Sequence, residues 1–153
     1  MARKNILLVL FCLVVMLCGC GKAKPVEVIS YYQDDRLMEH YGNTYTSYGS
    51  VEYEQITVEW QDASGRESFV GPYEPKYRGI IHLSTEQAGL LMKSYEWSEA
   101  TPQIVFDSIK YDISDSNIWY TSKDFENDLF TKVAINYVSF NGTDAIIFEI
   151  QVM

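Results

Sequence analysis

Hydrophobic positions divide the chain into a continuous apolar segment near the N-terminus and a longer region of short patterned segments. Residues 6–18 form an unbroken apolar run of 13 residues. Beyond residue 25, short stretches rich in β-branched and aromatic residues are separated by Gly, Pro, Asn, Asp and Ser, which is typical of strands joined by turns. This pattern predicts strands at 26–32, 51–60, 67–70, 80–83, 104–113 and 118–121.

The predicted strand 51–60 alternates in two phases. Val51 and Tyr53 belong to the first phase, and Ile56, Val58 and Trp60 belong to the second. A change of phase indicates a bulge or register break, which we place near Glu54 and Gln55. The alternation directs Glu52, Glu54 and Glu59 toward solvent, so we do not assign these carboxylates to glycoside hydrolysis.

The clearest helix signal spans residues 85–97. Ser84 and Gln87 form a capping-box pattern at its start, and Pro102 prevents its continuation. An apolar stripe at helical spacing follows the cap at Ala88, Leu91, Met92 and Tyr95. Shorter helical turns are predicted at 35–41, with Asp34-Asp35 as the N-cap, and at 124–130. Segments 42–50 and 71–79 are rich in turn-forming residues and are predicted as loops.

Asn141-Gly142 is the strongest structural signal in the C-terminal region. This dipeptide favours a two-residue type I′ turn between antiparallel strands. Such a turn sets the register so that paired residue numbers sum to 283. One face of the hairpin then gathers six apolar side chains, those of Val133, Ile135, Tyr137, Ile146, Phe148 and Ile150.

Together these elements predict an α+β fold. We expect an antiparallel β-sheet of about six to eight strands, with one main helix packed on it and a C-terminal β-hairpin. The alternative is a β-sandwich with a single helix. Residues 28–153 are long enough for a single globular domain with its own core, and residues 20–27 form a short polar tether before it.

The leader has the three parts of a secretory signal. Arg3 and Lys4 are a positive n-region, the apolar run follows, and Gly19 supplies the small residue before a cleavage site. A helix of 13 residues is about 20 Å long, whereas a hydrocarbon core is about 30 Å thick. We therefore interpret residues 1–19 as a cleaved signal peptide; a membrane-spanning helix and a signal without lipid are the alternatives.

The segment Leu17-Cys18-Gly19-Cys20 resembles the lipobox of bacterial lipoprotein precursors. The resemblance covers about the first 21 residues and does not extend into the domain. It implies that Cys20 becomes the first mature residue and carries acyl chains, so that the protein faces outside the cytoplasm on the cell membrane. Two or more acyl chains make such anchoring stable. Either a Gram-positive surface or a Gram-negative leaflet fits this pattern.

Composition narrows the classes of partner. Removal of the leader takes away every cysteine except Cys20, so the mature domain has neither a disulfide nor another thiol. It also takes Arg3 and Lys4, which leaves 10 basic residues against 21 acidic ones, a net charge of −11. An acidic domain opposes nucleic-acid binding and gains no attraction to anionic lipid. Membrane attachment is therefore expected through the lipid alone.

One segment carries a modest binding signal. Tyr73, Lys76, Tyr77 and Arg78 combine aromatic and basic side chains in the predicted loop 71–79. Such groups on a Pro-stiffened loop suit an anionic glycan or a peptide. A plain connector is the simpler interpretation. The 12 tyrosines of the chain likewise fit ordinary strand packing, or a stacking surface for sugar rings or peptides.

We predict no metal site, no cofactor and no catalytic residue. His40 and His82 are 42 positions apart and lack ligand spacing, and the segment 112–117 departs from a calcium loop where that loop requires Gly. The sequence thus favours a non-enzymatic binding or interaction module with an envelope protein or a glycan as its partner. A cell-envelope enzyme such as a hydrolase, or an accessory subunit of a surface complex, is the alternative. The oligomeric state is not indicated.

Overall fold

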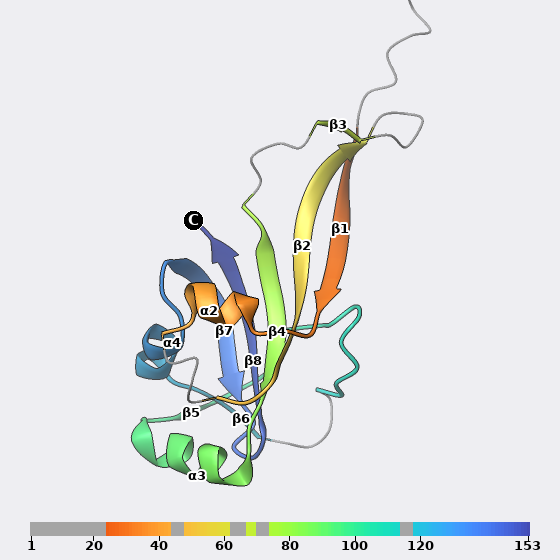
Figure 1. Cartoon of the computed structure of the whole chain (residues 1–153). Helices are drawn as coiled ribbons and strands as arrows, with labels where there is room; N and C mark the ends of the chain where they lie inside the picture. Colours follow the sequence, from red (N-terminus) through yellow and green to blue (C-terminus); the bar gives the residue numbers. More distant parts are fainter. Residues whose placement is uncertain (1–23, 44–47, 62–66, 70–73, 114–117) are drawn as a thin grey trace, which may run out of the picture. The chain divides into compact units, whose positions relative to one another are not determined.

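The computed structural model describes residues 24–43, 48–61, 67–69, 74–113 and 118–153. Its strands are β1 (Lys24–Tyr32), β2 (Val51–Gln61), β3 (Glu67–Phe69), β4 (Lys76–His82), β5 (Ser98–Ala100), β6 (Trp119–Thr121), β7 (Val133–Phe140) and β8 (Ala145–Val152). The described helices are α2 (Arg36–Tyr41), α3 (Thr85–Ser94) and α4 (Lys123–Leu129). The strands form an antiparallel sheet in the order β1-β2-β4-β8-β7-β6-β5, and β3 pairs with β2 (Figure 1). This agrees with the predicted sheet-dominated class.

The chain divides into two compact units, residues 1–27 with 58–72 and residues 28–57 with 73–153. In the first unit, β3 pairs with the end of β2, and the register shifts between Trp60 and Gln61. Residues 24–27, which the sequence pattern assigned to a tether, belong to β1. The candidate site and the polar contacts described below lie in the second unit.

The sheet of the second unit is buried on both faces, because consecutive strand residues contribute to different cores. Ile81 and Ile146 belong to the first core, whereas their neighbours Ile80 and Ile147 belong to the second. Leu37 and Met38 of α2, Ala88 and Leu91 of α3, and Phe125 and Leu129 of α4 also belong to the first core. Ile104 and Ile109 belong to the second core. Three helices therefore cover the face of the sheet at the first core. A single segment covers most of the face at the second core.

That segment, residues 101–113, is called the cover segment here, and it corrects one prediction. The sequence pattern placed a strand at 104–113, but these residues form neither helix nor strand. Ile104 and Ile109 are buried in the second core, and Phe106, Tyr111 and Ile113 pack against it, whereas Val105 is exposed. The amides of Ser108 and Ile109 donate to the carboxylate of Glu54 instead of to a neighbouring strand. The apolar alternation correctly indicates that part of this segment is buried, but it does not indicate which groups its backbone amides bond to.

Helix α3 confirms the predicted start. Ser84 Oγ accepts from the Gln87 amide at 3.2 Å, and the Ser84 amide donates to Gln87 Oε1 at 2.8 Å. The helix ends at Ser94, earlier than the predicted Trp97, and Ser98–Ala100 then pairs with β6. At the start of α2, Asp35 occupies the N-cap position without a side-chain bond, and Asp34 Oδ1 accepts from the Arg36 amide at 3.1 Å.

The C-terminal hairpin is confirmed, but its predicted register is wrong. Phe140 pairs with Ile146 and Val138 with Phe148, so paired numbers sum to 286 instead of 283. The connection is longer than two residues, because Asn141 uses its side chain as a cap for the loop. Asn141 Oδ1 accepts from the amides of Thr143, Asp144 and Ala145 at 3.0, 3.0 and 2.9 Å.

A second irregularity changes one face of the hairpin. The register shifts between Ile135 and Tyr137. Ile135 therefore packs against the first core as predicted, whereas Tyr137 packs against the second. Ile146, Phe148 and Ile150 share the first core, as expected.

Two predictions about the centre of the sheet are also wrong. Lys76 to Gly79, predicted as part of a loop, lie in β4, which pairs with β2 on one side and β8 on the other. The bulge predicted near Glu54 and Gln55 is absent, since the β2–β4 register is regular from Val51 to Ile56. Tyr53 and Glu54, which point to opposite faces of β2, are both buried, so both faces are covered at this point.

Candidate binding site: a tyrosine pocket

A cavity of about 330 Å³ lies within the second unit. We call it the tyrosine pocket; its lining consists of Tyr32, Arg36, Leu37, His40, Tyr41, Tyr53, Gln55 and Tyr77. Four of these eight residues are tyrosines. Leu37 is the one lining residue without a polar side-chain atom. The volume is at the lower end of the range typical of small-ligand sites, about 300–1,000 Å³.

Strand pairing brings the pocket residues together. Tyr53 and Gln55 are two positions apart on β2 and therefore project to the same face. Gln55 is the direct cross-strand partner of Tyr77 on β4. Tyr32 is the last residue of β1, the neighbour of β2, and α2 follows it closely with Arg36, Leu37, His40 and Tyr41. Three adjacent strands and one short helix thus make the walls.

The tyrosine rings form a connected aromatic wall. Tyr32 and Tyr53 are stacked, with ring centroids 5.1 Å apart and an interplanar angle of 20°. Tyr77 meets Tyr53 edge to face at 6.0 Å and meets Tyr41 in a tilted arrangement at 6.1 Å. His40 adds an edge contact to Tyr41 at 5.2 Å. Offset and edge-to-face pairs are the favoured geometries for aromatic side chains, so each ring supports its neighbours.

The polar groups beside the pocket are tied together by Asp34. Arg36 Nε donates to Asp34 Oδ2 at 2.9 Å, and the Tyr53 hydroxyl donates to Asp34 Oδ1 at 3.0 Å. The hydrogen bond from Arg36 lowers the pKa of Asp34 below its ordinary value. Burial, followed by the hydrogen bond to Asp34, raises the pKa of Tyr53 well above its usual range. Burial also raises the pKa of Tyr77. The raised pKa keeps the phenols of Tyr53 and Tyr77 neutral at physiological pH.

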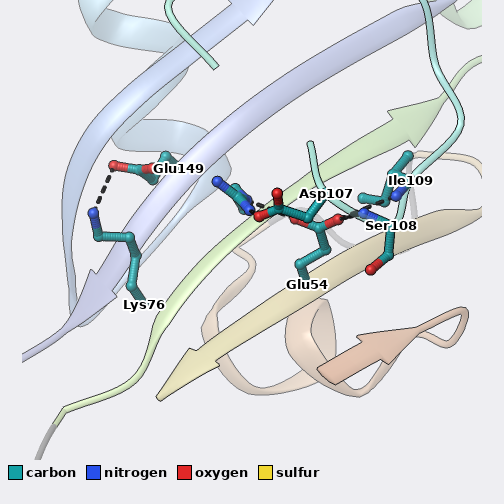
Figure 2. Close-up of polar contacts among 7 residues, drawn as sticks. Glu54, Lys76, Asp107, Ser108, Ile109 and Glu149 are labelled. Atoms are coloured by element: carbon teal, nitrogen blue, oxygen red, sulfur yellow. Dashed lines mark hydrogen bonds and ion pairs between the residues drawn. The ribbon is translucent and has the colours of Figure 1, made fainter. Parts of the chain in front are cut away.

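The structure separates the residues of the predicted basic and aromatic cluster. Tyr77 lines the tyrosine pocket, whereas Lys76 and Arg78 project to the opposite face of β4. Lys76 Nζ is 3.4 Å from Glu149 Oε1, and Arg78 Nε donates to Glu54 Oε2 at 2.6 Å (Figure 2). Tyr73 lies outside the described residues. The binding role of these residues stays a prediction, but Lys76, Tyr77 and Arg78 do not share one surface.

Glu54 is the main correction to the predicted polar face. Its side chain is fully buried, and not solvent-exposed as the alternation suggested. Oε2 accepts from Arg78, and Oε1 accepts from the amides of Ser108 and Ile109 (Figure 2). Arg78 also contacts Asp107. Although burial opposes the charge of Arg78, its pairing with Glu54 and Asp107 raises its pKa. This network fastens the cover segment to the sheet.

His82 lies next to Glu52 on the same face of the sheet as Glu54. His82 Nε2 is 2.9 Å from Glu52 Oε1, and the Tyr31 hydroxyl donates to Glu52 Oε2. The hydrogen bond from Tyr31 lowers the pKa of Glu52. The side chain of His82 is 39% exposed. His40 does not belong to this cluster; it lines the tyrosine pocket.

Sequence reasoning missed the tyrosine pocket as a site, although it noted the abundance of tyrosine. Tyr32, Tyr53 and Tyr77 lie on three strands and are separated by more than 20 positions each. Their proximity depends on the β1-β2-β4 order, which no local pattern reveals. The available signal was a tyrosine in each of two predicted strands, Tyr32 and Tyr53; Tyr77 lay in a segment predicted as a loop.

Some expectations concern residues that the structure does not describe. Cys20 and the rest of the leader lie outside the described residues, as do residues 114–117 of the segment compared with a calcium loop. In the described part of the chain, no helix combines the length and apolar character needed to cross a membrane. The described residues also contain no group of three or more His, Cys, Asp and Glu side chains placed to hold a metal ion. Comparison of the chain with protein-family models, curated proteins and solved structures gave no match.

Proposed function

We propose that the chain is a lipid-anchored, extracytoplasmic binding module of the bacterial cell envelope, with the tyrosine pocket as its ligand site. The observation that carries the binding role is the cavity of about 330 Å³ walled by four tyrosine rings. Concave sites with aromatic walls and a few placed polar groups are the usual form of small-ligand sites. The partner is an envelope glycan or protein segment that presents a ring to this wall.

We infer a non-enzymatic role from the side chains that line the pocket. The lining residues include one imidazole, that of His40, and no carboxylate, thiol or aliphatic hydroxyl. Nucleophilic catalysis requires a nucleophile such as a thiol, aliphatic hydroxyl or carboxylate within hydrogen-bond reach of its base, and the lining offers His40 no such partner. A binding module therefore suits the pocket better than a hydrolase does. The proposal also includes α3 as the main helix packed on the sheet, supported by the burial of Ala88 and Leu91.

The anchor is tested by expressing the full chain in a bacterium with Cys20→Ser, and with Cys18→Ser as the matched control. We expect the unchanged chain and Cys18→Ser to incorporate labelled fatty acid and to sediment with membranes at mature size. Cys20→Ser should retain its leader and lose the acyl label. Maturation of Cys20→Ser at the same size, with unchanged membrane partition, would contradict the anchor.

The pocket is tested on the full chain in detergent with a library of ring compounds that includes sugars, phenols, indoles and nucleobases. Binding is followed by backbone amide chemical shifts. We expect at least one class to shift the amides of β1, β2, β4 and α2 beside the pocket. If no class shifts them at millimolar concentration, the pocket is not a ligand site and the binding role fails.

A further inference from the structure

The charges beside the tyrosine pocket bear on what kind of ligand it takes. Arg36 and Asp34 neutralise each other through a two-nitrogen contact, with the Nη2 atom 2.5 Å from Asp34 Oδ2. Lys76 and Arg78, which suggested an anionic ligand, lie on the opposite face and are paired with Glu149 and Glu54. The chain as a whole carries a formal charge of −9. An anionic ligand is therefore disfavoured, because the charge of Arg36 is already neutralised by Asp34 and the chain as a whole is negative.

A cationic ligand is disfavoured by the same arginine. The guanidinium carbon of Arg36 lies 5.3 Å from the ring centroid of Tyr32, so a cation of the protein itself already lies over that aromatic face. Cation–π attraction operates within about 6 Å of a ring centroid. A second cation would have to compete with the guanidinium for this ring.

A purely apolar ring is disfavoured by the polar atoms of the lining. The four phenols, His40 and Gln55 direct hydrogen-bonding groups around an aromatic wall. The Tyr53 hydroxyl keeps its bond to Asp34, but an apolar ligand that displaced water from the other polar groups of the lining would leave those groups without partners. Hydroxyl groups both donate and accept, so a polyhydroxylated ring can match phenol, amide and imidazole groups together. The C–H faces of such a ring can also rest on the negative faces of the tyrosines.

We propose that the tyrosine pocket binds a neutral sugar ring, as found in an uncharged envelope glycan. This inference rests on the proposed binding function and adds the class of its ligand. The volume corresponds to about eleven water molecules at about 30 Å³ each, which suits a mono- or disaccharide. It replaces the anionic glycan that the basic residues of the sequence suggested.

The test uses the full chain in a detergent without sugar headgroups, because glycoside detergents would compete for the site. Glucose, galactose and N-acetylglucosamine are compared with glucuronate as the anionic analogue and glucosamine as the cationic one. Saturation-transfer NMR and titration measure each dissociation constant. We expect the best neutral sugar to bind at about millimolar strength, at least about fivefold more tightly than either charged analogue.

Adjacent tyrosines of β1 provide a matched pair of variants. Tyr32→Ala removes a ring of the pocket wall, whereas Tyr31→Ala removes a ring whose hydroxyl bonds to Glu52 on the other face. Tyr32→Ala should weaken sugar binding at least about fivefold, and Tyr31→Ala should leave it within about twofold. Gln55→Ala provides a second pocket variant with a smaller structural change, and thermal unfolding establishes that each variant is folded.

The outcomes separate the ligand class from the binding function. Tighter binding of glucuronate or glucosamine than of every neutral sugar would overturn the neutral class while the pocket remained a site. Binding of phenols or indoles without any sugar would overturn the carbohydrate class in the same way. Sugar binding that Tyr32→Ala and Gln55→Ala leave unchanged would place the sugar elsewhere and overturn this inference. Failure of every ring compound would reject the proposed function itself.

Discussion

Arg78 donates from Nε to Glu54 Oε2 at 2.6 Å, and the two residues are direct cross-strand partners on β4 and β2. Glu54 is fully buried, and the side chain of Arg78 is 15% exposed. The other oxygen of Glu54 accepts two amides of the cover segment. A buried ion pair adds little net stability over apolar residues, but removal of one partner leaves an uncompensated charge. The pair therefore fixes the position of the cover segment on the second face of the sheet.

Glu54→Ala is expected to lower the free energy of unfolding by about 3–5 kcal/mol, because it leaves Arg78 with only the exposed Asp107 as a partner and leaves two amides without their acceptor. Lys76→Ala is the matched control, since its pair with Glu149 is partly exposed and its loss should cost about 1 kcal/mol or less. Urea unfolding at neutral pH measures both values. Equal effects of the two substitutions would show that the Glu54 network does not hold the cover segment.

Two glycines are expected to respond to alanine with opposite signs. A Cβ at Gly79 would lie 2.5 Å from the Glu52 carbonyl oxygen and 2.6 Å from Phe148 Cζ, so the strands around β4 would have to move. Gly79→Ala should destabilise the fold by about 1–3 kcal/mol. Gly89 lies inside α3 with nothing within 4 Å of its added Cβ. Gly89→Ala should stabilise by about 0.5–1 kcal/mol, as judged by urea midpoints. A Gly79→Ala protein at least as stable as the unchanged chain would contradict the close packing of β2, β4 and β8.

Asn141 is expected to be the most sensitive residue of the hairpin loop. It is buried, and its side chain accepts from three loop amides and donates to Asp144 and the Tyr111 hydroxyl. Asn141→Ala leaves several of these groups unpaired, so we expect a loss of at least about 2 kcal/mol. Thr143→Ala is the control from the same loop and should cost less than about 1 kcal/mol. Similar losses for both, measured by thermal unfolding, would show that the side-chain cap is not decisive.

Local patterns predicted the elements that depend on residues close in sequence. The Ser84–Gln87 capping box, α4 and the existence of the terminal hairpin are of this kind, because a few neighbouring residues decide them. The hairpin register failed for a related reason. Asn141-Gly142 predicts a backbone turn, whereas the Asn141 side chain forms the loop by accepting from the amides of residues 143–145.

Features that depend on long-range partners could not be predicted. The residues near Glu54 in the sequence give no sign that it pairs with Arg78 and with amides of the cover segment. The alternation therefore predicted an exposed side chain for this buried carboxylate. The alternation of 104–113 indicates burial. The amides of Ser108 and Ile109, however, donate to the carboxylate of Glu54 and not to a neighbouring strand. The tyrosine pocket likewise depends on the order of β1, β2 and β4. The sequence shows that these tyrosines are present, but it does not show that they are neighbours in the fold.

The cluster of Tyr31, Glu52 and His82 gives the fold a dependence on acid pH. The hydrogen bond from Tyr31, with a smaller contribution from His82, lowers the pKa of Glu52 below its ordinary value of 4.5. The unfolded chain therefore takes up a proton at Glu52 at a higher pH than the folded chain does. The stabilisation is complete above pH 4.5 and is lost as the pH falls through the lowered pKa of the folded state.

Glu52→Gln should accordingly flatten the loss of stability below pH 4.5, because glutamine takes up no proton. Urea midpoints measured at intervals from neutral pH to about pH 3 give the slope for each protein. Tyr31→Phe keeps the carboxylate but removes the hydrogen bond that contributes most to its shift. It should therefore raise the pKa of Glu52 toward 4.5 and reduce the slope in the same window, with His82 still present. Asp34, whose pKa is also lowered, continues to contribute in both variants. Curves for Glu52→Gln and the unchanged chain that run parallel through this range would show that Glu52 is not stabilised in its charged form by the fold.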